Sequence, residues 1–365
     1  MTLKQKLKNP LAMTLALTLA LGTASVSLIG CSGALTSSNN LRETARIAMN
    51  KGDYKASEDA LKSAISKDEN AGEKNNGDLA EDLRLLGMLN RKQGKLDDAE
   101  KNLERSIELR QKELKPGLLE LASSLNTMGN TLTDKGQYIE AEELIRQSMQ
   151  VREKNLDADS IPLAESQNSL GRLYVMAGFF NEAEPLLKLA QSTFDKNESK
   201  VPAELQADVR SNLGTLYFYQ GKLDKAEPLY RWALDSYEKQ FGKESPKTAN
   251  AMNNLAEVLR ANNKSADAER LYKDAISIYK KRNMTEVNEY ASTLNNLAVL
   301  YHSQARYSDA EPLYKEAIKI YEKTDSDRSP QLANILNNYA ELYKATNRPE
   351  EGVKLVQRAG RIMTQ

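Results

Sequence analysis

The feature that most constrains this chain is a sequence pattern that recurs eight times with a period of about 42 residues. One clear copy runs from Leu294 to Ile318, LNNLAVLYHSQARYSDAEPLYKEAI, with a break between two apolar patterns at Ala305. The equivalent positions of the eight copies are Gly52, Gly94, Gly136, Gly178, Gly221, Asn263, Ala305 and Asn347. A fixed period of this length is typical of a solenoid built from stacked supersecondary units.

Each copy predicts a helical hairpin. The apolar residues follow helical spacing on both sides of the break, with Leu294, Leu297, Ala298 and Tyr301 before it and Tyr307, Ala310, Tyr314 and Ala317 after it. Glycine or asparagine at the break favours the end of a helix. We therefore expect an all-α chain whose hairpins lie near residues 41–66, 82–110, 124–152, 166–194, 209–238, 251–280, 293–322 and 335–362.

The repeated pattern resembles the tetratricopeptide repeat, and most closely the long-period subclass found in kinesin light chains. The signature is an Asn pair followed by an apolar residue and Ala, as in Asn253-Asn254-Leu255-Ala256, Asn295-Asn296-Leu297-Ala298 and Asn337-Asn338-Tyr339-Ala340. The first two copies lack the Asn pair. The resemblance covers residues 41–365 and implies a right-handed superhelical solenoid of about eight hairpins with a concave groove that binds a protein or peptide.

The first 30 residues have the composition of a secretory signal. Lys4, Lys6 and Lys8 precede an apolar run that ends at Gly30 and Cys31. The end of this run resembles a bacterial lipobox, which implies a signal peptide at 1–30 and lipidation of Cys31; an uncleaved membrane anchor is the alternative. Residues 31–40 then predict a lipidated flexible tether. We expect a lipid-anchored protein of the bacterial envelope, on the outer membrane facing the periplasm or the cell surface if the cell has one.

The composition argues against several kinds of chemistry. The chain has one His and one Cys, so a zinc site built from His or Cys pairs and thiol catalysis are both excluded. No glycine-rich phosphate loop or nucleophile elbow is present. Without residues 1–30 the chain has 48 basic and 51 acidic residues, which gives no basic surface for nucleic acid. We expect no enzyme activity, no metal and no cofactor.

A ladder of polar side chains is predicted to line the groove. These residues flank the buried stripe of each first helix and are Asn126, Asn130, Asn168, Arg172, Asn212, Asn253, Asn254, Asn295, Asn296, Asn337 and Asn338. Amides can bind the backbone of an extended peptide, although they can instead hold neighbouring helices together. Phe218 and Tyr219 lie beside the buried Tyr217 position, and with Val175 and Met176 they are expected to form an apolar floor.

The sequence therefore predicts a membrane-anchored scaffold that binds an extended peptide or a partner protein in the concave groove. Two alternatives remain open, a pilotin-like or outer-membrane assembly lipoprotein and a self-associating structural protein of the envelope. The last copy ends without a polar capping helix, which leaves self-association through the C-terminal repeat open.

Overall fold

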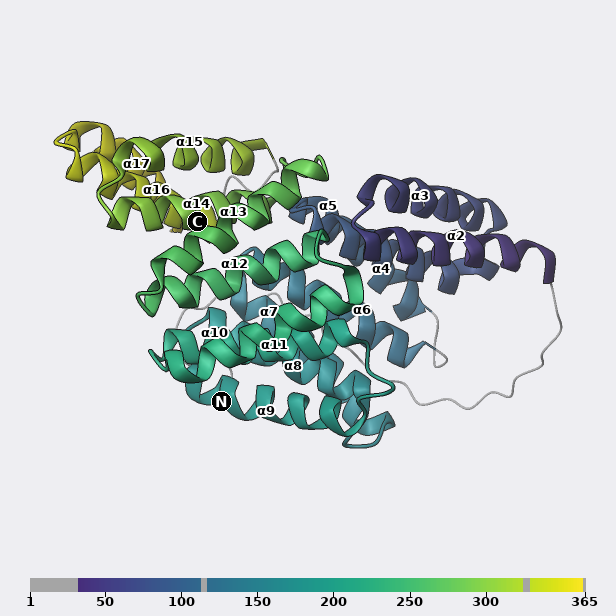
Figure 1. Ribbon diagram of the computed structural model, residues 1–365. Coiled ribbons are helices and arrows are strands. Elements are labelled where there is room, and N and C mark those ends of the chain that lie inside the picture. The colour runs from purple at the N-terminus through teal and green to yellow at the C-terminus, as the bar shows by residue number, and fades with distance from the viewer. Residues whose placement is uncertain (1–31, 113–116, 324–328, 364–365) are drawn as a thin grey trace.

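The computed structural model describes residues 32–112, 117–323 and 329–363, and all of these are helical or in the turns between helices. The α-helices form eight antiparallel hairpins that follow one another along the chain (Figure 1). Hairpins 1 to 4 are α2 (Ser32–Lys51) with α3 (Tyr54–Ala71), α4 (Asn76–Lys92) with α5 (Leu96–Lys112), α6 (Leu118–Asp134) with α7 (Tyr138–Asn155), and α8 (Ile161–Met176) with α9 (Phe180–Lys196). Hairpins 5 to 8 are α10 (Ala203–Tyr219) with α11 (Leu223–Phe241), α12 (Pro246–Ala261) with α13 (Ser265–Lys281), α14 (Asn288–Ser303) with α15 (Tyr307–Lys323), and α16 (Pro330–Ala345) with α17 (Pro349–Met363). A short 3-10 helix, η1 (Glu73–Asn75), links hairpins 1 and 2.

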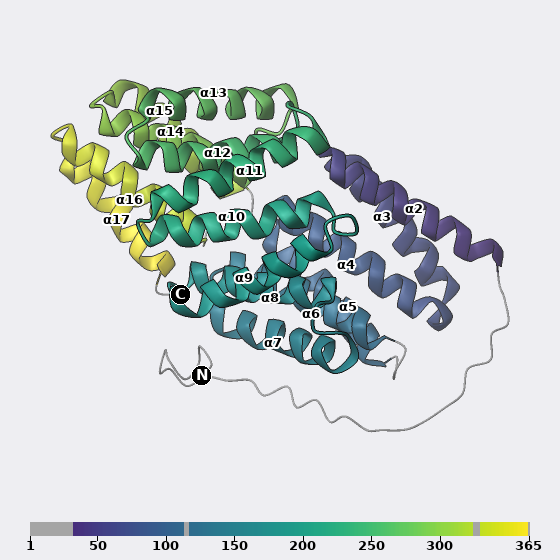
Figure 2. The ribbon, with the colours of Figure 1, turned by 60° about the horizontal axis from the view of Figure 1, so that its bottom comes forward.

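The expected all-α solenoid of eight hairpins is confirmed. Helices pack extensively within a hairpin and between adjacent hairpins. The chain winds so that hairpins 1 and 2 return to the side of hairpins 6 and 7, as the two views in Figures 1 and 2 show. None of the described helices is long and apolar enough to cross a membrane. Cys31 and the rest of the predicted signal lie outside the described residues.

The eight breaks share one backbone conformation. All of the predicted turn positions have φ between 58° and 80°, in the left-handed region. Glycine adopts this region freely and Asn tolerates it, but at Ala305 (φ 58°) the Cβ atom approaches the carbonyl oxygen. One of the eight hairpins therefore closes with local strain.

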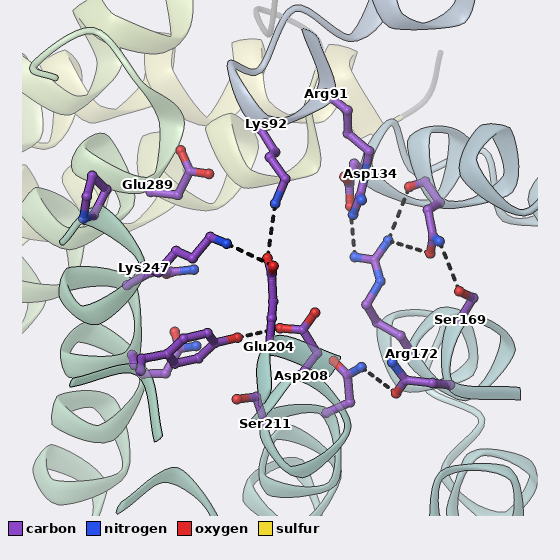
Figure 3. A pocket seen from close by; sticks show the side chains of 18 of the residues that line it. Arg91, Lys92, Asp134, Ser169, Arg172, Glu204, Asp208, Ser211, Lys247 and Glu289 are labelled. Atoms are coloured by element: carbon purple, nitrogen blue, oxygen red, sulfur yellow. Dashed lines mark hydrogen bonds and ion pairs between the residues drawn. The ribbon is translucent and has the colours of Figure 1, made fainter. Parts of the chain in front are cut away.

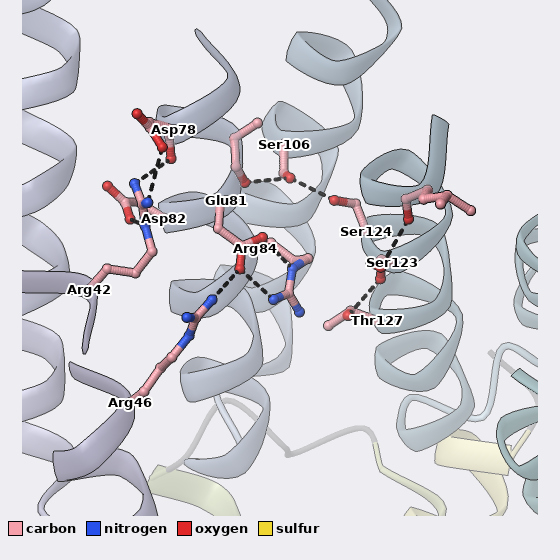
Figure 4. A network of polar contacts seen from close by, with 12 residues as sticks. Arg42, Arg46, Asp78, Glu81, Asp82, Arg84, Ser106, Ser123, Ser124 and Thr127 are labelled. Carbon is pink, nitrogen blue, oxygen red and sulfur yellow. Dashed lines mark hydrogen bonds and ion pairs between the residues drawn. The ribbon is translucent and has the colours of Figure 1, made fainter. Parts of the chain in front are cut away.

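The predicted tether at residues 31–40 is wrong from Ser32 onward, because α2 begins there and is the first helix of hairpin 1. Polar contacts with the next helices fix this helix. Ser38 Oγ donates to Asp68 at 2.7 Å, and Arg42 Nε donates to Asp82 at 2.6 Å. Arg42 also pairs with Asp78 at 3.0 Å (Figure 4). A tether would leave Asp68 and Asp82 buried without these donors.

Asp82 is the most perturbed acid of this cluster. Burial raises its pKa to about 7 from the usual 3.8, although Arg42 stabilises the carboxylate, and the nearby Asp68 raises the pKa further. Arg42, Asp68 and Asp78 are the charged groups that face it from α2, α3 and α4.

The free energy of unfolding should therefore depend on pH through Asp82. Because the pKa is higher in the folded state, the folded chain binds the proton more tightly. The resulting stabilisation is complete below about pH 4 and is lost as the pH rises through about 7. We expect urea unfolding of Asp82→Asn to show a smaller decrease in stability between pH 5 and 8 than the wild type. Asp59→Asn, at an exposed acid of α3, serves as the control; equal pH profiles for wild type and Asp82→Asn would contradict this account.

Gly178 and Ala305 occupy equivalent turns with positive φ, but only Gly178 adopts this conformation without strain. No atom lies within 4 Å of the position of a Cβ on Gly178, so only the backbone opposes a side chain there. Gly178→Ala should destabilise the chain by about 1 kcal/mol, and Ala305→Gly should stabilise it by about the same amount. Urea unfolding of both variants checks the prediction. Changes of the same sign in the two variants would contradict the assignment of strain to Ala305.

Candidate functional site

A polar cavity with a volume of about 580 Å³ lies inside the superhelix (Figure 3). We call it the central chamber. One side is formed by the C-terminal ends of α4 and α6 and by α8, and the other by α10, α12 and the first turns of α14 and α16. The first helices of seven hairpins are in this wall because the first helix of each hairpin faces the inside of the superhelix. Tyr54, Tyr237 and Tyr279 come from second helices.

Two carboxylates of the chamber are each held between two cations. Asp134 accepts from Arg91 Nε at 2.6 Å and from Arg172 at 2.8 Å. Glu204 pairs with Lys247 at 2.8 Å and with Lys92 at 3.4 Å. Burial opposes ionisation of both acids, but the paired cations outweigh it and hold the pKa of each carboxyl below its usual value. Both acids therefore stay ionised at neutral pH.

Two other acids of the chamber have the opposite shift. Burial, with the nearby charge of Glu204, raises the pKa of Asp208, whose carboxylate accepts from the Tyr237 hydroxyl at 2.5 Å. Burial also raises the pKa of Glu289. Burial lowers the pKa of Lys247, which lies 4.0 Å from the Phe241 ring centroid. The chamber thus offers charged groups of both signs and carboxyl groups that take up a proton more readily than usual.

The amide ladder is present, but its members bond mainly to one another. Asn126 and Asn130 donate to Ser169, Asn212 donates to Asn168, Asn253 to Asn254, Asn296 to Asn253, Asn295 to Asn296, and Asn338 to Asn295. The donor–acceptor distances run from 2.9 to 3.3 Å. Five of these seven bonds join first helices of adjacent hairpins, and the other two lie between neighbours within one helix, so the alternative packing role is realised. Each amide keeps a second donor or acceptor, so a role in binding stays a prediction.

Only part of the predicted groove set meets in the chamber. Asn130, Asn168, Arg172, Asn212 and Asn254 line it. The predicted residues outside its wall are Asn126, Asn253, Asn295, Asn296, Asn337, Asn338, Phe218 and Tyr219.

The predicted apolar floor is incomplete. Val175 is buried in the core and Phe218 is partly buried against it. Tyr219 is 55% exposed and stacks on Phe180 with 6.1 Å between ring centroids. Met176 is also exposed. The exposed Tyr219, stacked on the partly buried Phe180, therefore replaces the broader floor that the sequence suggested.

Most of the charged residues of the chamber are not among the predicted site residues, namely Asp134, Glu204, Asp208, Lys247 and Glu289. A signal was available for three of them. Glu204, Lys247 and Glu289 occupy the same place in the first turns of α10, α12 and α14, at steps of 43 and 42 residues, and Gln331 follows 42 residues later. Among the described residues, no group of three or more His, Cys, Asp or Glu side chains is placed to hold a metal ion.

Comparison with known families agrees with the repeat pattern. The sequence profile of the tetratricopeptide repeat matches residues 37–112, 120–196, 205–281 and 289–365. The chain belongs to the tetratricopeptide repeat family. Each match spans two hairpins, and together they cover most of the chain. A search of curated protein sequences finds no significant match.

Several solved tetratricopeptide-like structures are similar. The Rap conjugation gene regulator of plasmid pLS20 in complex with the Phr* peptide is 14% identical, with a TM-score of 0.65 over 90% of this chain and 95% of that chain. A Rap protein complexed with Competence and Sporulation Factor is 13% identical, with a TM-score of 0.63 over 92% and 98%. BtubC (BKLC) from P. vanneervenii is 26% identical, with a TM-score of 0.48 over 63% and 90%. These similarities concern the fold.

The amide ladder predicts that two Asn residues of first helices, one in the ladder and one outside it, differ in their contribution to the free energy of unfolding. Asn296 bonds to Asn253 of the previous hairpin, whereas Asn250 is exposed at the chamber wall and no hydrogen bond to its side chain is found among the described residues. Asn296→Ala should destabilise the array by about 1 kcal/mol, because the buried Asn253 loses its donor. Asn250→Ala should change stability by less than about 0.5 kcal/mol. Urea unfolding of both variants tests this, and equal losses would contradict a structural role for the ladder.

Proposed function

We propose that this tetratricopeptide repeat protein is a scaffold that holds an extended segment of a partner protein in the central chamber. The observation that carries the proposal is the chamber itself, a concave polar cavity lined by first-helix side chains of seven hairpins. Its amides, hydroxyls and paired charges offer donors and acceptors along a line of successive helices, which suits the repeating polar groups of an extended backbone.

The proposal includes attachment to a bacterial membrane through a lipid on Cys31. The sequence at the end of the apolar run supports it, since a small residue and the sole cysteine stand together at Gly30 and Cys31. A lipid with several acyl chains gives stable anchoring, whereas one chain is marginal. In this arrangement α2, which begins one residue later, brings hairpin 1 close to the membrane surface.

Two proteins of the same fold support the use of such an array for binding, since one is described in complex with the Phr* peptide and the other with Competence and Sporulation Factor. The chamber is proposed to bind rather than to catalyse. A pilotin-like or assembly role in the envelope would be a special case in which the partner is one dedicated membrane protein.

The test is a photo-crosslinking experiment in cells. A photoreactive amino acid replaces Asn250, which is exposed at the chamber wall, or Tyr219, the exposed aromatic of α10. The control position is Lys101, an exposed residue of α5 outside the chamber wall. We expect one envelope protein to be captured from Asn250 and not from Lys101. Mass spectrometry of the adducts identifies it.

Other outcomes separate the alternatives. Capture only of a second copy of this chain would favour self-association, for which α17 has exposed apolar residues at Val353, Val356 and Met363. The same adducts from Lys101 as from Asn250 would overturn the chamber as the binding site.

A Cys31→Ser variant should move from the membrane fraction to the soluble fraction; if it stays with the membrane, the proposed lipid anchor is wrong.

A further inference from the structure

The two ends of the array meet along a seam between successive turns of the superhelix. The turns of hairpins 1, 2 and 3 face the starts of α12, α14 and α16, at a constant separation of 194 residues: Gly52 faces Pro246, Gly94 faces Asn288, and Gly136 faces Pro330. A Cβ on Gly52 or on Gly136 would lie 2.9 Å from the Cγ of the facing proline. Only a residue without a side chain lets the two turns approach this closely.

This seam is a contact between turns and helix starts, not between packed helices. The helix pairs that pack extensively belong to the same hairpin or to adjacent hairpins, and none joins hairpins 1 to 3 with hairpins 5 to 8. The ion pair between Lys92 and Glu204 does cross from hairpin 2 to hairpin 5, at 3.4 Å. Both side chains are about one-quarter exposed or more, which limits the stabilisation that this pair provides.

A second cavity of about 580 Å³ lies in the seam, and we call it the seam cavity. Its walls come from the turns of hairpins 1 and 2 on one side and from the loop between α13 and α14 on the other. Tyr54 and Met284 line both this cavity and the central chamber, so they form the partition between the two. Separation of the turns at this place would open a path into the chamber.

The seam cavity has an excess of positive charge. Five basic residues, Lys51, Lys55, Lys95, Arg282 and Lys323, line it together with only two acidic residues, Asp53 and Glu286. Glu286 is paired with Lys323 at 2.7 Å, and the Asp53 carboxylate accepts from the Ala56 amide at the start of α3. Among the described residues, no carboxylate lies within ion-pair distance (4 Å) of Lys51, Lys55 or Arg282, although Arg282 Nε donates to the backbone carbonyl of Glu244 at 3.0 Å and interacts at longer range with the Glu244 charge.

These unmatched cations come from both sides of the seam. Lys51 and Lys55 belong to hairpin 1, and Arg282 follows α13 of hairpin 6. Like charges on the two sides of the seam repel, and the repulsion is largest at low ionic strength. A compact anion with several negative charges would replace this repulsion by attraction, because one bound ligand would attract cations of both turns.

We propose that the seam cavity is a binding site for a small polyanion of the oligophosphate class, and that the bound anion fastens the two turns of the superhelix together. Phosphate groups fit better than the carboxylates of a peptide, because the three unmatched cations converge on one cavity and require concentrated charge. The inference goes beyond the proposed scaffold function and does not depend on what occupies the central chamber. It does predict that the anion controls access to the chamber.

The test uses pyrophosphate as the probe and the full chain. Calorimetric titration at constant ionic strength should show saturable binding. The triple variant Lys51→Gln, Lys55→Gln, Arg282→Gln should bind at least about tenfold more weakly, since each lost charge-assisted contact contributes on that order. A matched triple variant at exposed lysines outside both cavities, Lys101→Gln, Lys196→Gln, Lys239→Gln, should bind as the wild type does. Absence of saturable binding, or equal loss in both triple variants, would overturn the site.

The proposed fastening of the two turns by the anion is tested separately, by a distance measurement across the seam. Spin labels at Lys62 of α3 and Lys280 of α13, both exposed and outside the two cavities, report the distance across the seam in a chain with Cys31→Ser. Pyrophosphate should shorten and narrow the distance distribution. The variant Lys55→Glu should give the short distance without pyrophosphate, because the new carboxylate faces Arg282 across the cavity. Binding without any change in the distance would overturn the fastening.

Two comparisons define the ligand class. Citrate, a carboxylate polyanion of similar charge, should bind more weakly than pyrophosphate, and equal affinity would overturn the assignment to phosphate. ADP carries the same two linked phosphates on a nucleoside. Tighter binding of ADP would identify a nucleotide as the source of the oligophosphate, and equal binding would identify the free oligophosphate. The crosslinking result from Asn250 is independent of these outcomes, so failure of one proposal leaves the other testable.

Discussion

The architecture depends on the close approach of the two helices within each hairpin. In hairpins 2 to 5 a glycine of the first helix makes this possible: a Cβ on Gly171 would lie 2.6 Å from Leu187 Cγ, and one on Gly214 would lie 2.9 Å from the Tyr230 ring. Hairpins 6 and 7 have Ala256 and Ala298 at this place, both fully buried. Because one face of the first helix is fixed against its partner, its other faces are left for the neighbouring hairpins and for the inside of the superhelix.

Repetition turns this local geometry into a site. Residues at one position of successive first helices form rows, so Glu204, Lys247 and Glu289 lie on one side of the chamber. The residues that complete the site, such as Lys92 and Arg91, belong to the preceding turn of the superhelix. The chamber is therefore a contact region between turns as much as a groove along one turn. Its paired charges serve the fold, since each paired carboxylate joins separate hairpins.

The sequence predicted the fold closely because the signals were local and repeated. Helical periodicity, small residues at the crossing points and a turn residue with positive φ agree in each copy, and each was found where the period placed it. Even the degenerate hairpin 1 forms, although its start was missed. There the apolar pattern is weak, and α2 is fixed by Ser38 and Arg42 through polar contacts with distant acids, which a search for hydrophobic periodicity does not detect.

By itself, the sequence determined the number of hairpins and the buried stripe of their helices, because these follow from the spacing of residues along one helix. The tertiary structure alone decided which inward residues meet. The small rotation between hairpins, summed over five steps, brings Gly52 to Pro246, and summed over three steps it brings Lys92 to Glu204. A sum of small rotations is not encoded at any one position, so the chamber and the seam appear only when the whole array is assembled.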